Sequence, residues 1–354
     1  MKLALLGDVH IGARNDNIAF HDHYEKFYRD VFFPYLDEHN ITTVHQFGDL
    51  FDRRKYINFY SLWRSRQYLF DELKKRDITM YVPVGNHDTY YKNTNDVNSP
   101  DLLLGEYKNI VVWSEPTVVE HDGMRIALLP WVCTNNYAQS VEFINNTDAH
   151  ILFGHLELAG FEMHRGSIID HGTIDTKLLE KFDIVCSGHY HHRSSRGNIN
   201  YLGTPYELTW VDYDDPRGFH IFDTETRELT FIRNPYKMFN KIHYDDQDKE
   251  MSDIVDVDLS DYRGTFVKVV VRNKTNPFWF DMLINKLEKA GVVDLQVVED
   301  HLNLNLEDDA DIIDEAEDTL TILRKVVDGI DINVPKKELD KFLSSLYNEA
   351  LHAE

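Results

Sequence analysis

Five short motifs, each directly after an apolar run, constrain the fold of this chain more than any other feature of its sequence. They are Asp8-Val9-His10, Gly48-Asp49-Leu50-Phe51-Asp52, Gly85-Asn86-His87-Asp88, Gly154-His155 and Gly188-His189-Tyr190-His191. The apolar runs before them are typical of buried strands and cover residues 3–6, 43–47, 80–84, 150–153 and 183–186. Because ligands of open α/β sheets bind at the carboxyl ends of the strands, we expect the five motifs to meet at one place.

The residue types in these motifs favour a centre that binds two divalent metal ions. Asp8 and His10 are two residues apart, as are His189 and His191, and this spacing returns side chains of an extended segment to one side. Asp49 offers a carboxylate that can bridge two ions. Two metal ions about 3.5–4 Å apart activate water and neutralise phosphoryl oxygens in phosphodiester hydrolysis. Mixed imidazole and carboxylate ligands favour manganese, iron or zinc over magnesium, which stays an alternative.

Length and composition are those of a globular protein without a membrane segment. The 354 residues suit one large domain with smaller additions. No apolar run reaches 18 residues, so no membrane span is expected. The apolar start ends at Gly7 without a cleavage pattern and reads as a first strand rather than a signal peptide. The two cysteines, Cys133 and Cys186, lie in apolar stretches, which predicts reduced core residues of a cytoplasmic protein.

The net charge of −24 argues against tight, sequence-blind binding of nucleic acid by electrostatics alone. It does not exclude a nucleic-acid substrate, because bound divalent cations change the charge locally and a partner subunit can supply a basic surface. Part of the excess is confined to residues 307–318, where eight of twelve residues are acidic.

The pattern of apolar residues predicts several units along the chain. Residues 1–235 predict an α/β sandwich of two sheets flanked by helices, with helices over 18–39 and 60–76. Strands at 199–202, 219–222 and 228–233 are expected in the second sheet. Residues 236–262 are polar and predict a linker. Residues 263–305 predict a small α+β domain of strand, helix and strand, and residues 306–354 an acidic segment followed by helices, the last of which packs on its own domain or docks on a partner.

In their order and spacing the five motifs resemble the calcineurin-like metallophosphoesterase family, over residues 1–235. The resemblance implies that one ion is held by Asp8, His10, Asp49 and His191. It implies that the second ion is held by Asp49, Asn86, His155 and His189, with Asp49 bridging. His87 is not a ligand in that family; by resemblance it acts as a general acid or stabilises the transition state beside the scissile phosphate.

A closer resemblance is to the SbcD-type recombination nucleases, including the compact versions of tailed bacteriophages. It rests on residues 48–52, on Gly-Ser-Ile-Ile-Asp at 166–170 and on Tyr-Leu-Gly-Thr-Pro at 201–205. It implies a manganese-dependent DNA nuclease, an exonuclease on double strands and an endonuclease on single strands, whose small domain caps DNA. It also implies a heterotetramer in which two nuclease subunits, paired through helices such as 18–39, bind an SbcC-type coiled-coil ATPase by the C-terminal helix. Some relatives have histidine where this chain has Asp52, which is expected to orient His87.

Several alternatives remain open at this stage. Arg14, Arg53, Arg54 and Lys55 follow the first two motifs and either contact substrate phosphates or belong to solvated loops. The same metal centre could instead serve a non-DNA phosphodiester or a phosphoprotein, although the appended domain and tail argue against a small substrate. A non-catalytic binding scaffold would predict lost ligands, and no ligand is missing.

Overall fold

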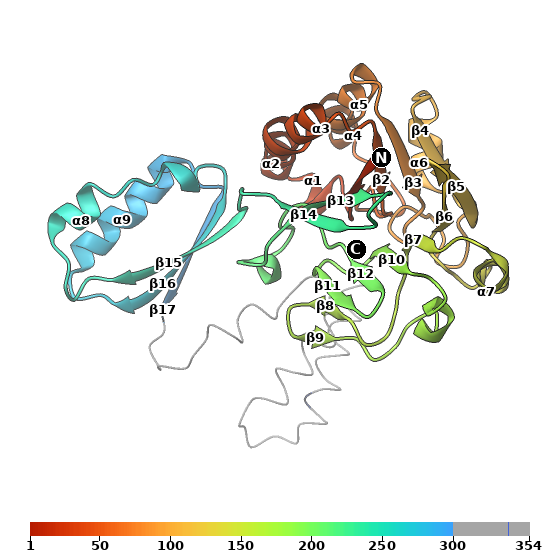
Figure 1. The fold of residues 1–354 in the computed structure, drawn as a ribbon. Helices are drawn as coiled ribbons and strands as arrows, with labels where there is room; N and C mark the ends of the chain where they lie inside the picture. The colour runs from red at the N-terminus through yellow and green to blue at the C-terminus, as the bar shows by residue number, and fades with distance from the viewer. Residues whose placement is uncertain (300–338, 340–354) are drawn as a thin grey trace. The chain divides into compact units, whose positions relative to one another are not determined.

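Two six-stranded sheets form the part of the chain that carries the motifs (Figure 1). The computed structural model describes residues 1–299 and residue 339. The strand order of the first sheet is β14 (Leu229–Arg233), β13 (Gly218–Asp223), β1 (Lys2–Leu6), β2 (Thr43–Gln46), β3 (Thr79–Pro83) and β4 (Ile110–Trp113). That of the second is β11 (Ser194–Arg196), β12 (Ile199–Tyr201), β10 (Ile184–Gly188), β7 (Ile151–His155), β6 (Met124–Leu129) and β5 (Thr117–His121). The predicted α/β fold with two sheets is confirmed.

The strands that bear motifs are parallel neighbours within each sheet. In the first sheet β1 pairs with β2 and β2 with β3, all in parallel. In the second sheet β7 and β10 are parallel, with Gly154 opposite Ser187 and His155 opposite Gly188. Parallel neighbours end on the same side of their sheet. The motif loops that follow β1, β2 and β3 therefore lie side by side, as do those that follow β7 and β10.

One prediction about the second sheet is wrong. Of the three strands expected there, only β12 belongs to it, whereas β13 and β14 extend the first sheet. Strand β13 runs antiparallel to β1, with Leu3 opposite Phe222. It occupies the side of β1 that β2 leaves free and satisfies backbone groups that would otherwise be unpaired. Periodicity predicts a strand but not the sheet edge to which it pairs.

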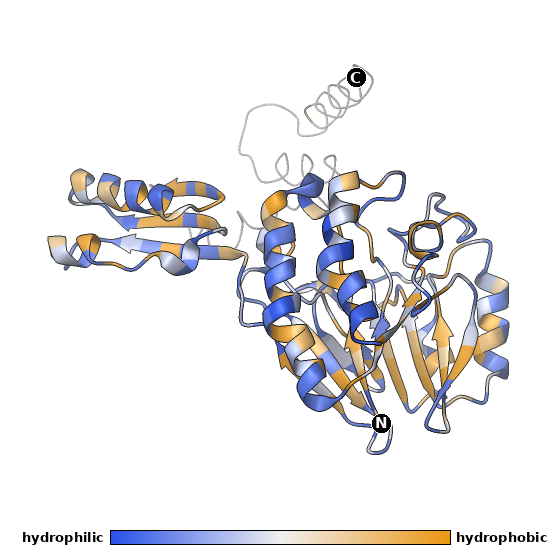
Figure 2. Ribbon diagram, turned by 90° about the horizontal axis from the view of Figure 1, so that it is seen from above, coloured by the Kyte–Doolittle hydropathy of each residue, from blue (hydrophilic) through white to orange (hydrophobic). Residues whose placement is uncertain are grey.

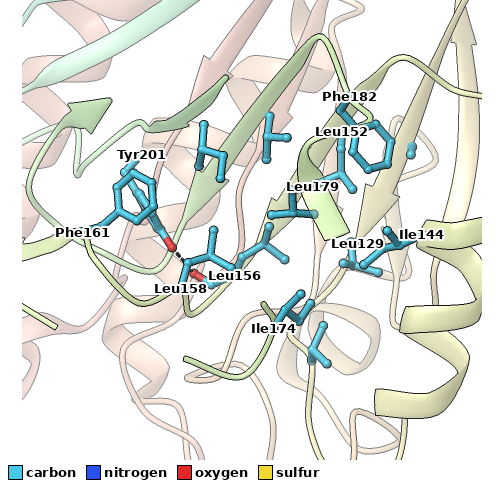
Figure 3. Packing of buried hydrophobic residues seen from close by; sticks show 14 of the residues in the cluster. Leu129, Ile144, Leu152, Leu156, Leu158, Phe161, Ile174, Leu179, Phe182 and Tyr201 are labelled. Carbon is cyan, nitrogen blue, oxygen red and sulfur yellow. Dashed lines mark hydrogen bonds between the residues drawn. The ribbon is translucent and has the colours of Figure 1, made fainter. Parts of the chain in front are cut away.

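The hydrophobic core has a layer between the sheets and a layer outside the second sheet. Leu5 and Phe47 of the first sheet meet Phe153 and Cys186 of the second in the inner layer. The outer layer joins β7 and β10 to α7 (Tyr137–Asn146), as seen for Leu152, Ile144 and Leu179 in Figure 3. The strands are largely hydrophobic and the outer sides of the helices are hydrophilic (Figure 2), as expected for sheets that line a core. Cys133 and Cys186 are buried and free, as predicted.

Both long helices of the sandwich occur where they were predicted, and each contains a π-helical turn. The first consists of α2 (Ile18–Phe27), a π turn (Tyr28–Phe32) and α3 (Phe33–His39). The second consists of α4 (Phe59–Ser65), a π turn (Arg66–Phe70) and α5 (Asp71–Lys75). Asn17 and Asn58 cap their amino ends. Helices α2 to α5 gather on the outer side of the first sheet (Figure 1).

Shorter elements complete the described part of the sandwich. They are α1 (Ala13–Asp16), α6 (Ser99–Leu104), the ribbon β8 (Glu162–His164) and β9 (Ser167–Ile168), and 3-10 turns at Thr176–Leu179 and Trp210–Asp212. No described helix is both long and apolar enough to cross a lipid bilayer.

The small domain has its own sheet and core. Its strands are β15 (Phe239–Asp245), β16 (Phe266–Asn273) and β17 (Asp294–Glu299), and its helices are α8 (Met251–Val255) and α9 (Pro277–Ala290), with a 3-10 turn at Ser260–Tyr262. Asn276 caps the start of α9 and Gly291, with φ of 83°, follows its end. Val269, Phe280 and Leu287 are central to the core.

The strand, helix and strand expected over 263–305 are present as β16, α9 and β17, and residues 236–262, expected to form a linker, also contain regular structure. That segment holds β15 and α8, and β15 pairs in parallel with β16 along seven residues of its length. Polar residues outnumber apolar ones along β15, and the consecutive pair Asn240 and Lys241 interrupts the alternation that would predict a strand. The acidic segment and the tail helices expected over 306–354 lie outside the described residues, except residue 339.

A buried pair of histidines joins the two sheets. His45 of β2 and His121 of β5 have their Nε2 atoms 2.9 Å apart, and they are 1% and 7% exposed. Burial lowers the pKa of both rings, that of His45 well below its usual 6.5. A hydrogen bond between these nitrogens requires at least one neutral ring, because an imidazolium can only donate.

This pair predicts a loss of stability in acid. Below about pH 6.5 the unfolded chain binds protons that folded His45 and His121 do not, so the free energy of unfolding falls by up to about 1.4 kcal/mol per pH unit for each ring. Urea unfolding at pH 7.5 and 5.5 measures this, and His45→Gln is expected to lose less stability between the two pH values than the unsubstituted chain. Equal losses in both proteins would contradict the assignment.

Candidate metal centre

The structure brings the five motifs together in three groups of candidate ligand atoms, two of which contain the expected ligands, while the third joins His10 to Asp52 and His87. Asp8, His10 and His191 form the first group, and Asp49, His155 and His189 form the second. Within each group the candidate ligand atoms lie within 4.8 Å of one another. The first two groups combine side chains from both sheets, so neither sheet alone forms the site.

Unsatisfied atoms in the first group fit a bound cation. The Nε2 atoms of His10 and His191 are 3.0 Å apart. The Asp8 carboxylate accepts a hydrogen bond from the backbone N–H of His189 at 2.8 Å through Oδ2, but its buried Oδ1 finds no hydrogen-bond partner among the described residues. A buried carboxylate oxygen without a donor is costly, and a cation beside it removes that cost.

The second group converges more tightly. Asn86 Oδ1 lies 2.8 Å from both His155 Nε2 and His189 Nδ1, and those two nitrogens are 3.3 Å apart. The other ring nitrogen of His155, Nδ1, donates to the carbonyl of Phe47 at 2.7 Å. This bond leaves Nε2 as the lone-pair nitrogen that a metal ion requires.

Asp49 lies between the two groups. Its Oδ2 is 3.4 Å from His155 Nε2 and 4.0 Å from His10 Nε2. Its Oδ1 accepts a hydrogen bond from the backbone N–H of His87 at 2.7 Å. Both carboxylate oxygens are therefore held by the third motif and by histidines of both groups, which is the position that a bridging carboxylate needs.

His87 is held by the backbone of Asp52 rather than by its side chain, which corrects the expected pairing. Nδ1 of His87 donates to the Asp52 carbonyl at 2.6 Å. The Asp52 carboxylate lies 3.2 Å from Nδ1 of His10 instead. A carboxylate behind a metal-ligating histidine fixes the orientation of its ring, and the Asp52 carboxylate lies on the Nδ1 side of His10. The His87 ring lies edge-on to the His10 ring, 4.9 Å between centroids.

The carboxylates and imidazoles of the centre shift one another's pKa values. Burial raises the pKa of Asp8 to about 7, and the neighbouring Asp49 adds to this. Burial alone would lower the pKa of His10 and His155, but carboxylates beside them outweigh it and raise both to about 9. Without metal the carboxylates therefore retain protons on nearby imidazoles, and ligands must lose these protons to bind a metal ion.

The backbone of the centre is strained and closely packed. His10, Asp49 and His189 have φ of 50°, 50° and 89°, a region that non-glycine residues occupy mainly where the surroundings enforce it. A Cβ on Gly85 would lie 2.1 Å from the Asp49 nitrogen, and one on Gly188 would lie 2.3 Å from Asp8 Oδ1. Glycine is therefore required where the third motif loop meets the second, and where the last motif loop meets the first.

The four basic residues expected to contact phosphates differ in their contacts with the protein and in their exposure. Nε of Arg14 donates to the Leu208 carbonyl at 3.2 Å, and Arg53 forms an ion pair with Asp16 at 3.2 Å. Arg54 lies over the Trp131 ring and donates to Thr89 Oγ1 at 3.1 Å. Lys55 is exposed. Protein groups thus already hold the three arginines.

Sequence reasoning missed two residues that hold the motif loops. Buried Asp88 accepts hydrogen bonds from the backbone N–H groups of Leu50, Phe51 and Gly85 and so joins the second motif to the third. The Gln46 side chain bonds both backbone groups of Gly48. An amide side chain two residues before the glycine of the second motif is the available signal for Gln46. Asp88 belongs to a motif, but no sequence pattern shows that its carboxylate holds backbone instead of metal.

Comparison with known proteins establishes the family. A model of the family described as calcineurin-like phosphoesterase matches residues 1–193. The chain belongs to this family. It is therefore a hydrolase of phosphate esters that uses divalent metal ions, in agreement with the carboxylate and histidine groups of the centre.

Two relatives have names that describe nucleases. The chain is 34% identical over 353 residues to a protein of Enterobacteria phage T4 named "Exonuclease subunit 1", with 99% of each chain covered. It is 23% identical over 199 residues to a protein of Staphylococcus saprophyticus subsp. saprophyticus that is named as the D subunit of the nuclease SbcCD. That similarity covers 54% of this chain and 48% of the relative.

The close packing at Gly85 generates a prediction. In Gly85→Ala the added methyl group displaces Asp49, so the rise in melting temperature on adding Mn²⁺ and the hydrolysis of bis-p-nitrophenyl phosphate are both expected to be lost. Gly105→Ala is the control, because Gly105 has φ of −59° and its Cβ would meet its nearest atom at 3.6 Å. A Gly85→Ala protein that Mn²⁺ stabilises normally would show that the loops tolerate a side chain there.

Proposed function

We propose that this phosphoesterase is a DNA nuclease, the catalytic subunit of an SbcCD-like recombination and repair complex. In this proposal it degrades double strands from their ends and cuts single strands. The observation that carries the proposal is the similarity over 353 residues to an exonuclease subunit, since it includes the small domain as well as the metal centre. The similarity to an SbcCD nuclease subunit supports the same class of substrate.

The proposed ligand sets follow the two groups of the centre. Asp8, His10, Asp49 and His191 hold one ion, and Asp49, Asn86, His155 and His189 hold the other. The chemistry that such a pair of ions supplies is activation of water at neutral pH and neutralisation of phosphoryl oxygens. Manganese is the proposed metal, because nitrogen ligands in both sets disfavour magnesium.

His87 and Asp52 have separate roles in this proposal. With Nδ1 of His87 donating to a carbonyl, its Nε2 is the nitrogen available to the substrate. There it protonates the leaving 3′ oxygen or stabilises the charge that develops on it. Asp52 holds the His10 ring in place through Nδ1. Exposed Lys55 is the best placed of the four basic residues to contact a phosphate directly, while Arg14, Arg53 and Arg54 shape the loops around it.

A non-DNA phosphodiester or a phosphoprotein is the second candidate substrate. The geometry of the metal centre suits it equally well. The similarity along the small domain favours the nuclease, because an enzyme for small diesters has no need of that domain. Substrate assays separate the two.

The nuclease proposal is tested with the purified chain, labelled linear double-stranded DNA and Mn²⁺, with and without its ATPase partner. His87→Ala is expected to lower the rate about 100- to 10,000-fold while keeping stabilisation by Mn²⁺, and Asp49→Asn to lose both. His150→Ala, whose side chain is 70% exposed, is the control and keeps full activity. Turnover of small diesters without cleavage of DNA, even with the partner, would refute the proposal.

The proposed partners are DNA, an SbcC-type ATPase and a second copy of this chain. The helix over 18–39 stays a candidate contact for the copy through its outer face, since Phe20, Tyr24 and Phe27 of its inner face are buried in its own domain. An exposed apolar patch suits the copy better. It lines a hollow of about 220 Å³ and comprises Tyr56, Phe59, Val97 and Leu102, with Phe59 90% and Leu102 72% exposed.

This patch predicts the oligomeric state. Phe59→Glu puts a charge into the proposed contact and is expected to turn a dimer into a monomer, as measured by light scattering at several concentrations. Ile168→Glu is the control, because Ile168 is also exposed, to 67%, but lies outside the patch. A dimer that survives Phe59→Glu would place the contact elsewhere.

A further inference from the structure

A buried arginine that belongs to none of the five motifs contacts the backbone of a candidate metal ligand. Arg217 directly precedes β13 and is 5% exposed. Its Nη1 donates to the carbonyl oxygen of His191 and, at 2.7 Å, to Thr204 Oγ1. Its Nη2 donates to Asp212 Oδ1 at 2.7 Å and Asp215 Oδ2 at 2.8 Å.

The contacts of Arg217 fix two consecutive residues of the last motif loop. The His191 carbonyl accepts a second hydrogen bond, from the backbone N–H of Thr204 at 3.2 Å. Nδ1 of His192 lies 2.8 Å from Asp215 Oδ2, the same oxygen that binds Arg217. Residues 191 and 192 are therefore tied by backbone and side chain to one buried ionic network.

Burying this ionic network costs free energy that an apolar core would not require. Burying a guanidinium with two carboxylates requires desolvation of all three groups, and apolar side chains of similar volume often stabilise a core as well. A planar guanidinium offers what apolar side chains do not, several donors in fixed directions. Here one of them is aimed at the backbone of a residue in the metal centre.

We propose that Arg217 is a positioning residue for the metal centre: it fixes the backbone of residues 191–192 and thereby holds the His191 imidazole at the ion that it shares with Asp8 and His10. This inference rests on the proposed role of His191 as a ligand. Arg217 touches neither substrate nor metal in this account and acts only through the loop.

A second contact of the same segment supports this role independently. The hydroxyl of Tyr206 donates to the Val9 carbonyl at 2.8 Å, and Val9 lies between Asp8 and His10. Tyr206 and Arg217 thus brace the backbone at both motifs that supply the first ligand group. Within the described part of the chain, Arg217 and Tyr206 donate to neither Asn86 nor His155 of the second group. His189 of the second group lies in the same loop as His191, so loss of the brace should weaken the ion of the first group more than the ion of the second.

The test is a titration of the purified full chain with Mn²⁺, in which electron paramagnetic resonance reports free Mn²⁺. The unsubstituted chain is expected to bind two ions. Arg217→Met is expected to bind one of them about 10- to 100-fold more weakly, the range for lost partners behind metal ligands, and to show a smaller loss of affinity for the other. The Mn²⁺ affinity of Arg217→Lys is expected to lie between those of the unsubstituted chain and Arg217→Met, because an ammonium group cannot reproduce the fork of donors.

A matched control separates positioning from simple loss of stability. Asn198 also bonds backbone carbonyls, those of Leu179 at 2.9 Å and Phe182 at 2.7 Å, away from the motif loops. Asn198→Ala is expected to lower the melting temperature without changing either Mn²⁺ affinity. If Arg217→Met does not fold, Tyr206→Phe, which removes one hydroxyl, is expected to weaken the same ion to a smaller degree.

Two results would overturn the inference. One is unchanged Mn²⁺ affinity in Arg217→Met, or in Tyr206→Phe where that variant replaces it. The other is equal weakening of both ions, as a general loss of structure would produce. Either result is distinct from failure of the proposed ligand sets, which would appear as fewer than two ions bound by the unsubstituted chain.

Discussion

The attraction between buried carboxylates and imidazoles across the two sheets is the interaction on which the rest of the site depends. Asp8 and Asp49 follow strands of the first sheet, and His155 and His189 belong to the second. They approach to 3.4 Å at Asp49 and His155. Carboxylates this deeply buried persist only with partners that neutralise them, so the same charges that hold the sheets' ends together create the demand for metal ions.

The backbone is arranged to allow this approach. Ligands with positive φ, such as His10 and Asp49, turn sharply at the strand ends, and Gly85 and Gly188 leave room for the opposite loops. Such strain persists where surrounding contacts enforce it. Asp88, Gln46 and the segment that contains Arg217 supply those contacts. Rigid placement of ligands is what a metal centre requires, because small errors in position weaken binding and catalysis.

Much of this could be predicted from the sequence because the informative residues are local. An apolar run followed by Asp, Asn or His identifies both a strand and its end, and this pattern alone predicts that Asp49 and His155 meet. The predictions that failed needed information that the spacing of residues in the sequence does not contain. The sheet to which β13 pairs, the strand β15 inside a polar segment and the pairing of Asp52 with His10 all depend on neighbours distant in the chain.

The central claim is that this centre holds two divalent ions with Asp49 between them. Anomalous diffraction from crystals of the full chain grown with Mn²⁺ tests it most directly. The account predicts two peaks about 3.5–4 Å apart, one beside Asp8, His10 and His191 and the other beside Asn86, His155 and His189. A single peak, or ions that do not contact Asp49, would contradict it.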